Sequence, residues 1–431
     1  MEKEKKSMAE KAAVARESLL PEEQQVKKDI REWSFLFLGS AIGSGILLLP
    51  LQAGKVSLYT TFISMVIALI GTYIGQKLMI RMTSTTPNCT SYDSAIENHL
   101  GKVAGIILSI IFIIFLFTIV VILGTGATNN FAATIQHYNF VHTDLEKYPL
   151  YILACMVVMA LPLLFGERFL LAMIEKVVAF KIVILAILII MFIPLWRPEN
   201  IHHYLSHAGT GIGLGAGVLV LLPVLIFGAT FFPSIGSMSR FFKFHYPTDS
   251  NEAMFKKANK TNIIAMILLA IVLVLFISST LFALTPQSLE YAGSHNLTAL
   301  AVIGQSDSGG FLANFSILAG YVITILAILT SFYAVIIGVI DGVITRLPKS
   351  AKINKKVVIV VVFILLFLWI VLNLNILSFI IHVISPLIVI FVFFIPVIAI
   401  YVSPKLKQFR GALPIISLIV GVFLMIASFI S

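Results

Sequence analysis

The sequence has few charged residues and only two cysteines, and each shortage excludes a class of protein. Charged residues make up 12% of the 431 residues, 59% are hydrophobic, and the mean hydropathy is +1.02. Because soluble domains carry about 25% charged residues, a water-soluble fold is excluded and we predict an all-α polytopic membrane protein. Cys89 falls in a polar loop and Cys155 in an apolar run, so neither a disulfide nor cysteine chemistry is predicted.

Enzyme motifs are missing as well. The chain contains no HExxH, no nucleophile elbow and no phosphate loop, and no stretch outside the apolar runs is long enough for a catalytic domain. We therefore predict that the protein is not an enzyme and needs no cofactor. The net charge of +10 could indicate nucleic acid, but the basic residues are spread over alternate loops. That distribution is typical of a topology signal, so the predicted partners are the lipid bilayer and a small molecule, with no nucleic acid and no obligate protein partner.

Eleven apolar runs are long enough, or nearly so, to cross a bilayer. They cover residues 33–52, 57–81, 103–136, 148–165, 168–196, 211–237, 261–284, 311–346, 356–376, 379–402 and 411–430. The loops alternate in basic content, and the poorer set contains only Lys55, Lys147 and Arg197. The positive-inside rule then places the N-terminus in the cytoplasm and Ser431 outside, consistent with an odd number of spans.

The first span contains a segment that is poor in helix formers. Its centre, GSAIGSG at residues 39–45, has three glycines and two serines within seven residues. Such a segment favours a break at mid-depth, which a membrane protein tolerates only where protein or a water-filled cavity takes up the freed backbone groups. We predict a binding site there. The alternative is close helix packing, since Gly39 and Gly43 have the Gly-x-x-x-Gly spacing.

The sixth span is predicted to be interrupted too, because FGATFFPSIG at residues 227–236 combines Pro233 with two glycines. Spans one and six would begin two inverted sets of five, and paired breaks in such halves indicate a transporter substrate site. The predicted organisation is a cytoplasmic tail at 1–32, spans one to five at 33–196, an external loop at 197–210, spans six to ten at 211–402, and a cytoplasmic loop with span eleven at 403–431.

Several motifs resemble one known family. LGSAIGSGILLLPLQAG is similar to the first-helix signature of the bacterial hydroxy and aromatic amino acid permeases, the serine/threonine and tyrosine/tryptophan permeases of the amino acid–polyamine–organocation superfamily. FGERFLLAMIEKVVAF, LLPVLIFGATFFPSIGS, ALTPQSLEYAGSHNLTAL and ILTSFYAVIIGVIDG add matches in order. The resemblance implies a leucine-transporter-like 5+5 inverted repeat plus one extra helix. It also implies ion-coupled amino acid import by alternating access across the bacterial inner membrane.

The resemblance also implies the substrate contacts. The substrate carboxylate would meet backbone N–H groups of Ser44 and Gly45, with Gly43 as a further donor, where a helix begins and its dipole favours an anion. Carbonyls freed at Ala41 and near Phe227 and Thr230 would hold the amino group. The Phe227 ring would close over the ligand, although an ordinary core or lipid-facing aromatic is the alternative.

The prediction of the coupling ion depends on Lys181. This lysine lies thirteen residues after Arg168, about 20 Å along the fifth span and near the bilayer middle, where a lysine costs about 2.5–3.5 kcal/mol. Some proton-coupled relatives have a lysine there, so we predict H⁺ coupling. The alternatives are a structural lysine, or Na⁺ bound by the carbonyls of Gly39 and Ile42 with the hydroxyls of Thr330 and Ser331.

Other possibilities stay open at this stage. Serine-type permeases carry a lysine where this chain has Thr330, so the sequence leaves the preferred amino acid undecided. A channel, or an amino acid receptor on the same fold, is the competing function, although no repeated charged or carbonyl ring indicates a channel. His203 and His207 have a spacing that can bind zinc and His202 adjoins them, but the shortage of further ligands favours an external polar loop without metal.

Overall fold

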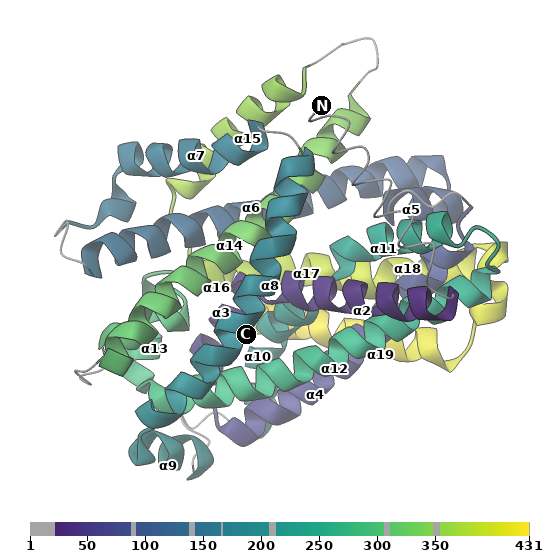
Figure 1. Cartoon of the computed structure of the whole chain (residues 1–431). Helices are drawn as coiled ribbons and strands as arrows, with labels where there is room; N and C mark the ends of the chain where they lie inside the picture. Colours follow the sequence, from purple (N-terminus) through teal and green to yellow (C-terminus); the bar gives the residue numbers. More distant parts are fainter. Residues whose placement is uncertain are drawn as a thin grey trace.

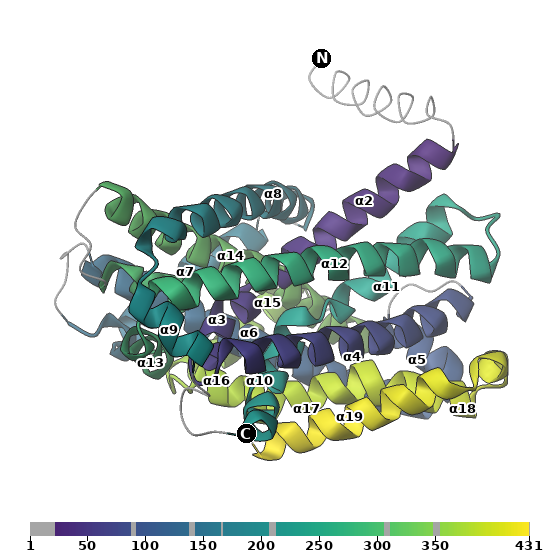
Figure 2. The ribbon, with the colours of Figure 1, turned by 90° about the horizontal axis from the view of Figure 1, so that it is seen from below.

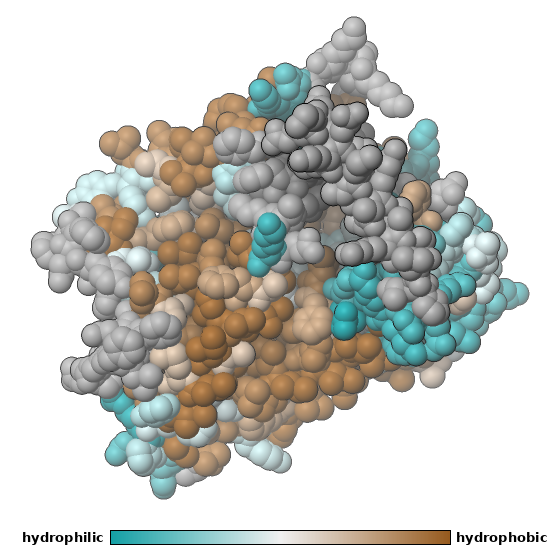
Figure 3. Space-filling model, in the orientation of Figure 1, coloured by the Kyte–Doolittle hydropathy of each residue, from teal (hydrophilic) through white to brown (hydrophobic). Residues whose placement is uncertain are grey.

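The computed structural model describes residues 22–87, 92–137, 143–164, 167–206, 213–305, 311–347 and 354–430, and most of them are helical. The long helices lie side by side in a bundle (Figures 1 and 2). Hydrophobic side chains cover much of the middle of the face in Figure 3, and hydrophilic ones gather at the end where α5 and α11 lie. An apolar belt next to polar ends is the surface that a bilayer requires.

Each of the eleven predicted spans coincides with helix in the structure. Eight segments in the described part are long and apolar enough to cross a membrane by themselves. They lie in α4 (Leu58–Thr85), α6 (Lys102–His137), α8 (Glu167–Phe192), α10 with α11 (Leu214–Ala229 and Phe232–His245), α12 (Asn251–Ala283), α14 (Phe311–Arg346), the run from α16 to α18, and α19 (Ala412–Ile430). Of the other three predicted spans, the first falls on the bent pair α2 and α3 (Glu22–Ala41 and Ser44–Ala53), which is long and apolar enough only when the two helices count as one span. The other two fall on α7 (Pro149–Leu164) and α15 (Lys355–Ile370), which have 16 residues each and are shorter than these segments.

Short helices lie at the two ends of the bundle. Helix α5 (Tyr92–Leu100) lies at one end, and α9 (Pro198–Ser206) and α13 (Pro286–Ser294) lie at the other (Figures 1 and 2). The predicted external loop at 197–210 therefore contains a helix. The 3-10 segments are η1 (Leu145–Lys147), η2 (Ile193–Leu195), η3 (Ala299–Gln305) and η7 (Pro404–Phe409).

The tenth span is a helix in which α-helical and π-helical segments alternate. It passes through α16 (Ile376–Phe379), a π-helical segment η5 (Ile380–Ile384), α17 (Ser385–Ile388), a second π-helical segment η6 (Val389–Phe394) and α18 (Ile395–Val402). Its side chains are mostly buried against neighbouring helices. Segments of π-helix inside α-helices are rare and often mark functional regions.

The helix of the first span begins inside the segment 1–32, which was predicted to be a cytoplasmic tail. Helix α2 begins at Glu22, and both Asp29 and Ile30 are buried. The segment 22–32 therefore continues the helix of the first span: most of its residues are exposed, while Asp29 and Ile30 are covered by neighbouring elements. The preceding part of that predicted tail lies outside the described residues.

Candidate functional site

The first break is a turn of two residues between α2 and α3. Ile42 and Gly43 are not helical, and the axes of the two helices differ by 53°. The N–H of Gly43 donates to the carbonyl of Ala41 at 2.7 Å. In a continuous helix this N–H would bond to the carbonyl of Gly39 instead. The break is therefore narrower than the predicted segment 39–45, because residues 39–41 stay helical and residues 44–45 already belong to α3.

This turn changes two of the predicted substrate contacts. The N–H of Gly43 and the carbonyl of Ala41 bond to each other, so in this conformation the Gly43 N–H is not a free donor and the Ala41 carbonyl already accepts one bond. The first N–H groups of a helix have no partner within it. Helix α3 begins at Ser44, which leaves the N–H groups of Ser44 and Gly45 as the donors that the break presents.

Three glycines around this break touch other helices closely. A Cβ added at Gly39 would overlap the Val178 side chain of α8, and one added at Gly43 would overlap the Ser331 hydroxyl of α14. At Gly45 it would lie 3.0 Å from the Cα of Gly228 in α10. Break and close packing therefore occur together in this segment, although the sequence presented them as alternatives.

The second break is made by Thr230 and Phe231, between α10 and α11. Thr230 is extended, with φ −98° and ψ 124°, and its hydroxyl donates to the carbonyl of Ile226 at 2.6 Å. Pro233 occupies the second position of α11 and cannot donate a helical bond back to Ala229. The interruption is short, and the segment Leu214–His245 still crosses as one span.

The two breaks lie side by side. Gly228, two residues before the second break, is in contact with Gly45 at the start of α3. The Phe227 ring lies there too, with its Cδ1 atom 3.1 Å from the position of a Cβ on Gly45. Phe227 is half-buried. The structure thus brings Phe227 to the N-terminal end of α3, where Ser44 and Gly45 present their N–H groups, and Thr230 follows three residues later in the chain.

Lys181 lies beside the first break. Its side chain is completely buried, and its Nζ donates to the hydroxyl of Thr330 on α14 at 2.9 Å. Val178, one turn earlier on α8, is the residue that contacts Gly39. Among the described residues no carboxylate forms an ion pair with Lys181. An amine and a hydroxyl that are 149 positions apart in the sequence therefore meet at a buried site next to the break.

Oxygen atoms proposed for sodium gather at the same place. The Ser331 hydroxyl is buried, lies against Gly43 and has no hydrogen-bond partner among the described residues. The Thr330 hydroxyl accepts from Lys181 and donates to the carbonyl of Leu326 at 2.8 Å. The lysine and the sodium alternative thus share one ligand, the Thr330 hydroxyl.

Two residues of this region were not identified from the sequence. Val178 lies three residues before Lys181, on the same face of the helix, and this spacing was the signal that could have identified it. Gly228 was noted only as part of the second break. A signal for it was its small size next to Phe227, since backbone can approach closely only where a side chain is missing.

The other candidate groups give no further site. Among the described residues no three His, Cys, Asp or Glu side chains are placed to hold a metal ion. His202 and His203 lie in α9, but His207, the second residue of the predicted zinc spacing, lies outside the described residues. Cys155 in α7 is a free cysteine, and Cys89 also lies outside them.

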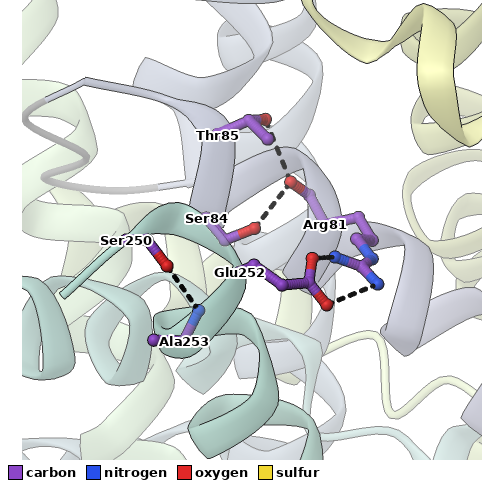
Figure 4. Close-up of polar contacts among 6 residues, drawn as sticks. All are labelled: Arg81, Ser84, Thr85, Ser250, Glu252 and Ala253. Carbon is purple, nitrogen blue, oxygen red and sulfur yellow. Dashed lines mark hydrogen bonds and ion pairs between the residues drawn. The ribbon is translucent and has the colours of Figure 1, made fainter.

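A cleft of about 640 Å³ lies where α4 ends and α12 begins. Figure 4 shows Arg81 at its wall, hydrogen-bonded by both guanidinium nitrogens to the carboxylate of Glu252. The Arg81 guanidinium also lies 3.2 Å from the centroid of the Phe255 ring and 4.6 Å from that of Phe409. Because Arg81 is paired with Glu252, this cluster fastens α4 to α12, and Lys405 is the other charged residue of the cleft lining.

Solved structures with the same overall fold are membrane transporters. A nucleobase-cation-symport-1 family transporter, Mhp1, in a closed conformation with bromovinylhydantoin bound, matches with a TM-score of 0.54 and 14% identity, covering 92% of this chain and 91% of that one. A mutant of the Eremococcus coleocola manganese transporter matches with a TM-score of 0.60 and 14% identity, covering 95% and 88%. At this identity the likeness shows the fold alone, and it confirms the leucine-transporter-like architecture predicted from the motifs.

Two bacterial relatives are named as serine or threonine/serine transporters. The chain is 26% identical over 410 residues to a protein named serine transporter from Escherichia coli O157:H7, which covers 93% of this chain and 91% of the relative. It is 26% identical over 416 residues to the threonine/serine transporter TdcC of Yersinia enterocolitica, covering 89% and 91%. No protein-family model matches the chain. The similarity nevertheless extends over nearly the whole of both chains and confirms the resemblance: the protein is a multi-pass membrane transport protein related to the bacterial hydroxy amino acid permeases.

Proposed function

We propose that the protein is a secondary active transporter that imports a hydroxy or aromatic L-amino acid across the bacterial cytoplasmic membrane by proton symport. The observation that carries this proposal is the meeting of the two breaks at Gly45 and Gly228. One break presents the N-terminus of a half-helix, and the other presents backbone that is not helical. An amino acid has one anionic and one cationic group, which these two kinds of backbone group complement.

The carboxylate of the substrate binds at the N–H groups of Ser44 and Gly45. The positive end of the α3 dipole favours an anion there, so no arginine is needed. The amino group binds at carbonyls near Phe227 and Thr230, with Ala41 contributing only when its turn with Gly43 opens. Spans one to five and six to ten form the inverted repeats, and the two breaks give each repeat a place where its first helix can bend.

The N-terminus lies in the cytoplasm and the C-terminus outside. The end of the bundle that carries α5 also carries Arg81, Lys243 and Lys405, each of which binds a neighbouring element. The end that carries α9 and α13 belongs to the loops with few basic residues. By the positive-inside rule the α5 end is cytoplasmic.

Proton coupling rests on the position of Lys181. Its ammonium group lies 2.9 Å from the hydroxyl of Thr330, which is one of the oxygen ligands that sodium symport would require. A sodium ion bound to the same hydroxyl would lie next to the ammonium group, and two cations so close together repel each other strongly in a buried site. Lys181 therefore replaces sodium, and the gain and loss of its proton couples transport to the proton gradient. Sodium symport is the alternative, and it requires Lys181 to leave Thr330.

Uptake into proteoliposomes tests the proposal. The purified protein should accumulate at least one radiolabelled substrate among serine, threonine, tyrosine, tryptophan and phenylalanine when an inward proton gradient is imposed. Trans-stimulated counterflow should accompany uptake, whereas a channel shows no trans-stimulation and a receptor binds without transport. Failure to transport all five amino acids would refute the proposed substrate class. Uptake that needs sodium and ignores the pH gradient would refute proton coupling.

Lys181→Ala should separate coupling from substrate movement. We expect the variant to lose accumulation driven by a pH gradient and to retain exchange of substrate for substrate, because exchange needs no net proton transfer. Lys176→Ala is the matched control, since Lys176 lies on the same helix and is exposed. If Lys181→Ala accumulates substrate as well as Lys176→Ala does, the lysine has only a structural role.

A further inference from the structure

Helix α5 connects the second and third spans at the polar end of the bundle (Figures 1 and 2). Ile96 is completely buried, and a Cβ added at Gly105 of α6 would lie 2.9 Å from the Cα of Glu97. The Tyr92 hydroxyl donates to the carbonyl of Phe391, in the second π-helical segment of the tenth span, at 2.6 Å. Helix α5 is therefore docked on α6 and tied to the middle of the tenth span's inner part.

The last turn of α5 carries a histidine that joins two further places. The His99 side chain is 5% exposed. Its Nε2 atom lies 3.1 Å from the carbonyl of Met82 in α4 and 3.1 Å from the hydroxyl of Thr86, directly after α4. Its Nδ1 atom lies 2.9 Å from the hydroxyl of Ser403, between α18 and η7. One ring thus holds α5 to the end of α4 and to the end of the tenth span.

These contacts determine which protonation state of the ring fits the docked helix. A carbonyl can only accept, so the proton of the neutral ring lies on Nε2, which donates to Met82. The Nδ1 atom then accepts from the hydroxyl of Ser403. Ser403 is 3% exposed, and its hydroxyl makes this single hydrogen bond among the described residues. A second proton on the ring would turn Nδ1 into a donor and leave a buried hydroxyl proton without an acceptor, which is unfavourable.

The charged groups that act on the ring from neighbouring elements are cationic. They are Lys405 of η7 and Lys243 of α11. The end of α4 presents a backbone carbonyl and hydroxyl groups to the ring, and these carry no charge. On α5 itself the acidic residues are Asp93 and Glu97, and neither is paired with His99 in the described part of the chain. A charged ring would therefore meet two like charges and no opposite one.

Docking of α5 consequently disfavours a protonated ring. Burial lowers the pKa of His99 from its usual value, Lys405 and Lys243 lower it further, and the bond to the Met82 carbonyl opposes this only in part. Release of α5 would return the ring to water, where its pKa is about 6.5. Because the released state then binds the proton more tightly, the docked state loses stability as the pH falls below about 6.5.

We propose that His99 is a sensor of cytoplasmic pH, whose protonation releases α5 from α4 and from the tenth span and thereby slows transport. Without this helix in place, the second, third and tenth spans lose their common contact at the cytoplasmic end. Proton symport carries protons into the cytoplasm, so the device reduces import when the cytoplasm is already acidic. This inference rests on the proposed transport function.

Substrate exchange in proteoliposomes with equal pH on both sides tests the inference without a proton gradient. Between about pH 7.5 and about pH 5.5, exchange by the parent should fall at least about fivefold, and exchange by His99→Gln less than about twofold. Glutamine can still donate to Met82 but takes up no proton in this range. His295→Gln, at an exposed histidine after α13, is the matched control and should behave as the parent does. If His99→Gln loses exchange in acid as fully as the parent, the inference is wrong.

Lys405→Gln keeps the histidine and changes only the charge beside it. Loss of this positive charge raises the pKa of His99, so the pH of half-maximal exchange should move upward by about half a unit. Lys407→Gln is the matched control, because Lys407 is exposed on the same segment and does not act on the ring. A histidine with only a structural role would not respond in this way, so an unchanged or lower midpoint in Lys405→Gln overturns the inference.

Hydrogen exchange of the α5 amides measures release of the helix directly and requires no transport. After correction for the intrinsic pH dependence of exchange, residues 92–100 of the parent should be protected at about pH 7.5 and lose protection at about pH 5.5, whereas His99→Gln should keep it. Equal protection of the parent at both pH values overturns the inference. A parent protein that transports no amino acid refutes the proposed function instead, so the two failures are distinguishable.

Discussion

The break in the first span is surrounded by atoms that leave no room for side chains, whereas the break in the sixth span follows from residues within the span. Around the first break, Gly39, Gly43 and Gly45 each face a different neighbouring helix at close range. At the second break, the Thr230 hydroxyl bonds to its own helix and Pro233 removes a helical bond. The first break therefore depends on tertiary packing, and the second depends on local chemistry.

This difference predicts unequal sensitivity to substitution. Added atoms at the first break collide with α8, α14 or α10, and they also occupy the place where a substrate would meet backbone. Changes at the second break alter only the conformational preference of a short segment of backbone, and the neighbouring helices still hold that segment in place. Substitutions at the first break should therefore cost more binding and more stability than comparable ones at the second.

Gly45→Val should have the largest effect. The Cβ would lie 3.0 Å from the Gly228 Cα and 3.1 Å from Phe227 Cδ1, and the two methyl groups would extend into the space in front of the α3 N–H groups. We expect the protein to remain folded in the membrane while uptake and the thermal stabilisation by substrate disappear. Gly43→Val should behave in the same way, because it meets Ser331.

Gly215→Val is the control for this prediction. Gly215 lies near the start of α10, and a Cβ there has no atom within 4 Å among the described residues. This variant should bind substrate as the parent does. If Gly45→Val keeps a normal substrate-induced thermal shift, the binding site lies elsewhere.

Gly39→Ala should have an intermediate effect. The new methyl group overlaps the side chain of Val178, and valine cannot rotate away easily because it is branched at Cβ. Overpacking of this kind costs about 1–3 kcal/mol. Thermal unfolding in detergent should show the loss. Val178→Ala in the same chain should restore most of it, and an equal loss in the single and double variants would show that the contact is not the cause.

Pro233→Ala should have the smallest effect. Proline lowers the entropy of the unfolded chain, so its replacement costs about 0.4–1 kcal/mol. Binding should change little, because Gly228 still packs on Gly45 and Phe231 still packs on Phe37. Substrate titration by thermal shift measures this. If Pro233→Ala removed binding as completely as Gly45→Val, the contrast between the two breaks would be wrong.

Much of the architecture follows from the sequence because its causes are local. The length of each apolar run, the glycines at 39–45 and the proline at 233 act within one or two helical turns, so the spans and both breaks could be predicted. The extent of the first break could not. Residues 39–41 remain helical. Here α8 packs against Gly39 and α14 packs against Gly43, and both of these helices are far away in the sequence.

Only the tertiary structure shows which residues far apart in the sequence form contacts with each other. The segment 22–32 is rich in charge and was expected to be solvated, but Asp29 is buried because Tyr246, 217 positions later, donates to it. Lys181 could be recognised as an unusual charge at mid-depth, while its partner Thr330 is supplied by packing of α8 on α14. Composition and local propensity were enough to predict a membrane protein of many helices with two interrupted spans. Which groups meet at the breaks depends on how the helices pack, and packing is a property of the whole chain.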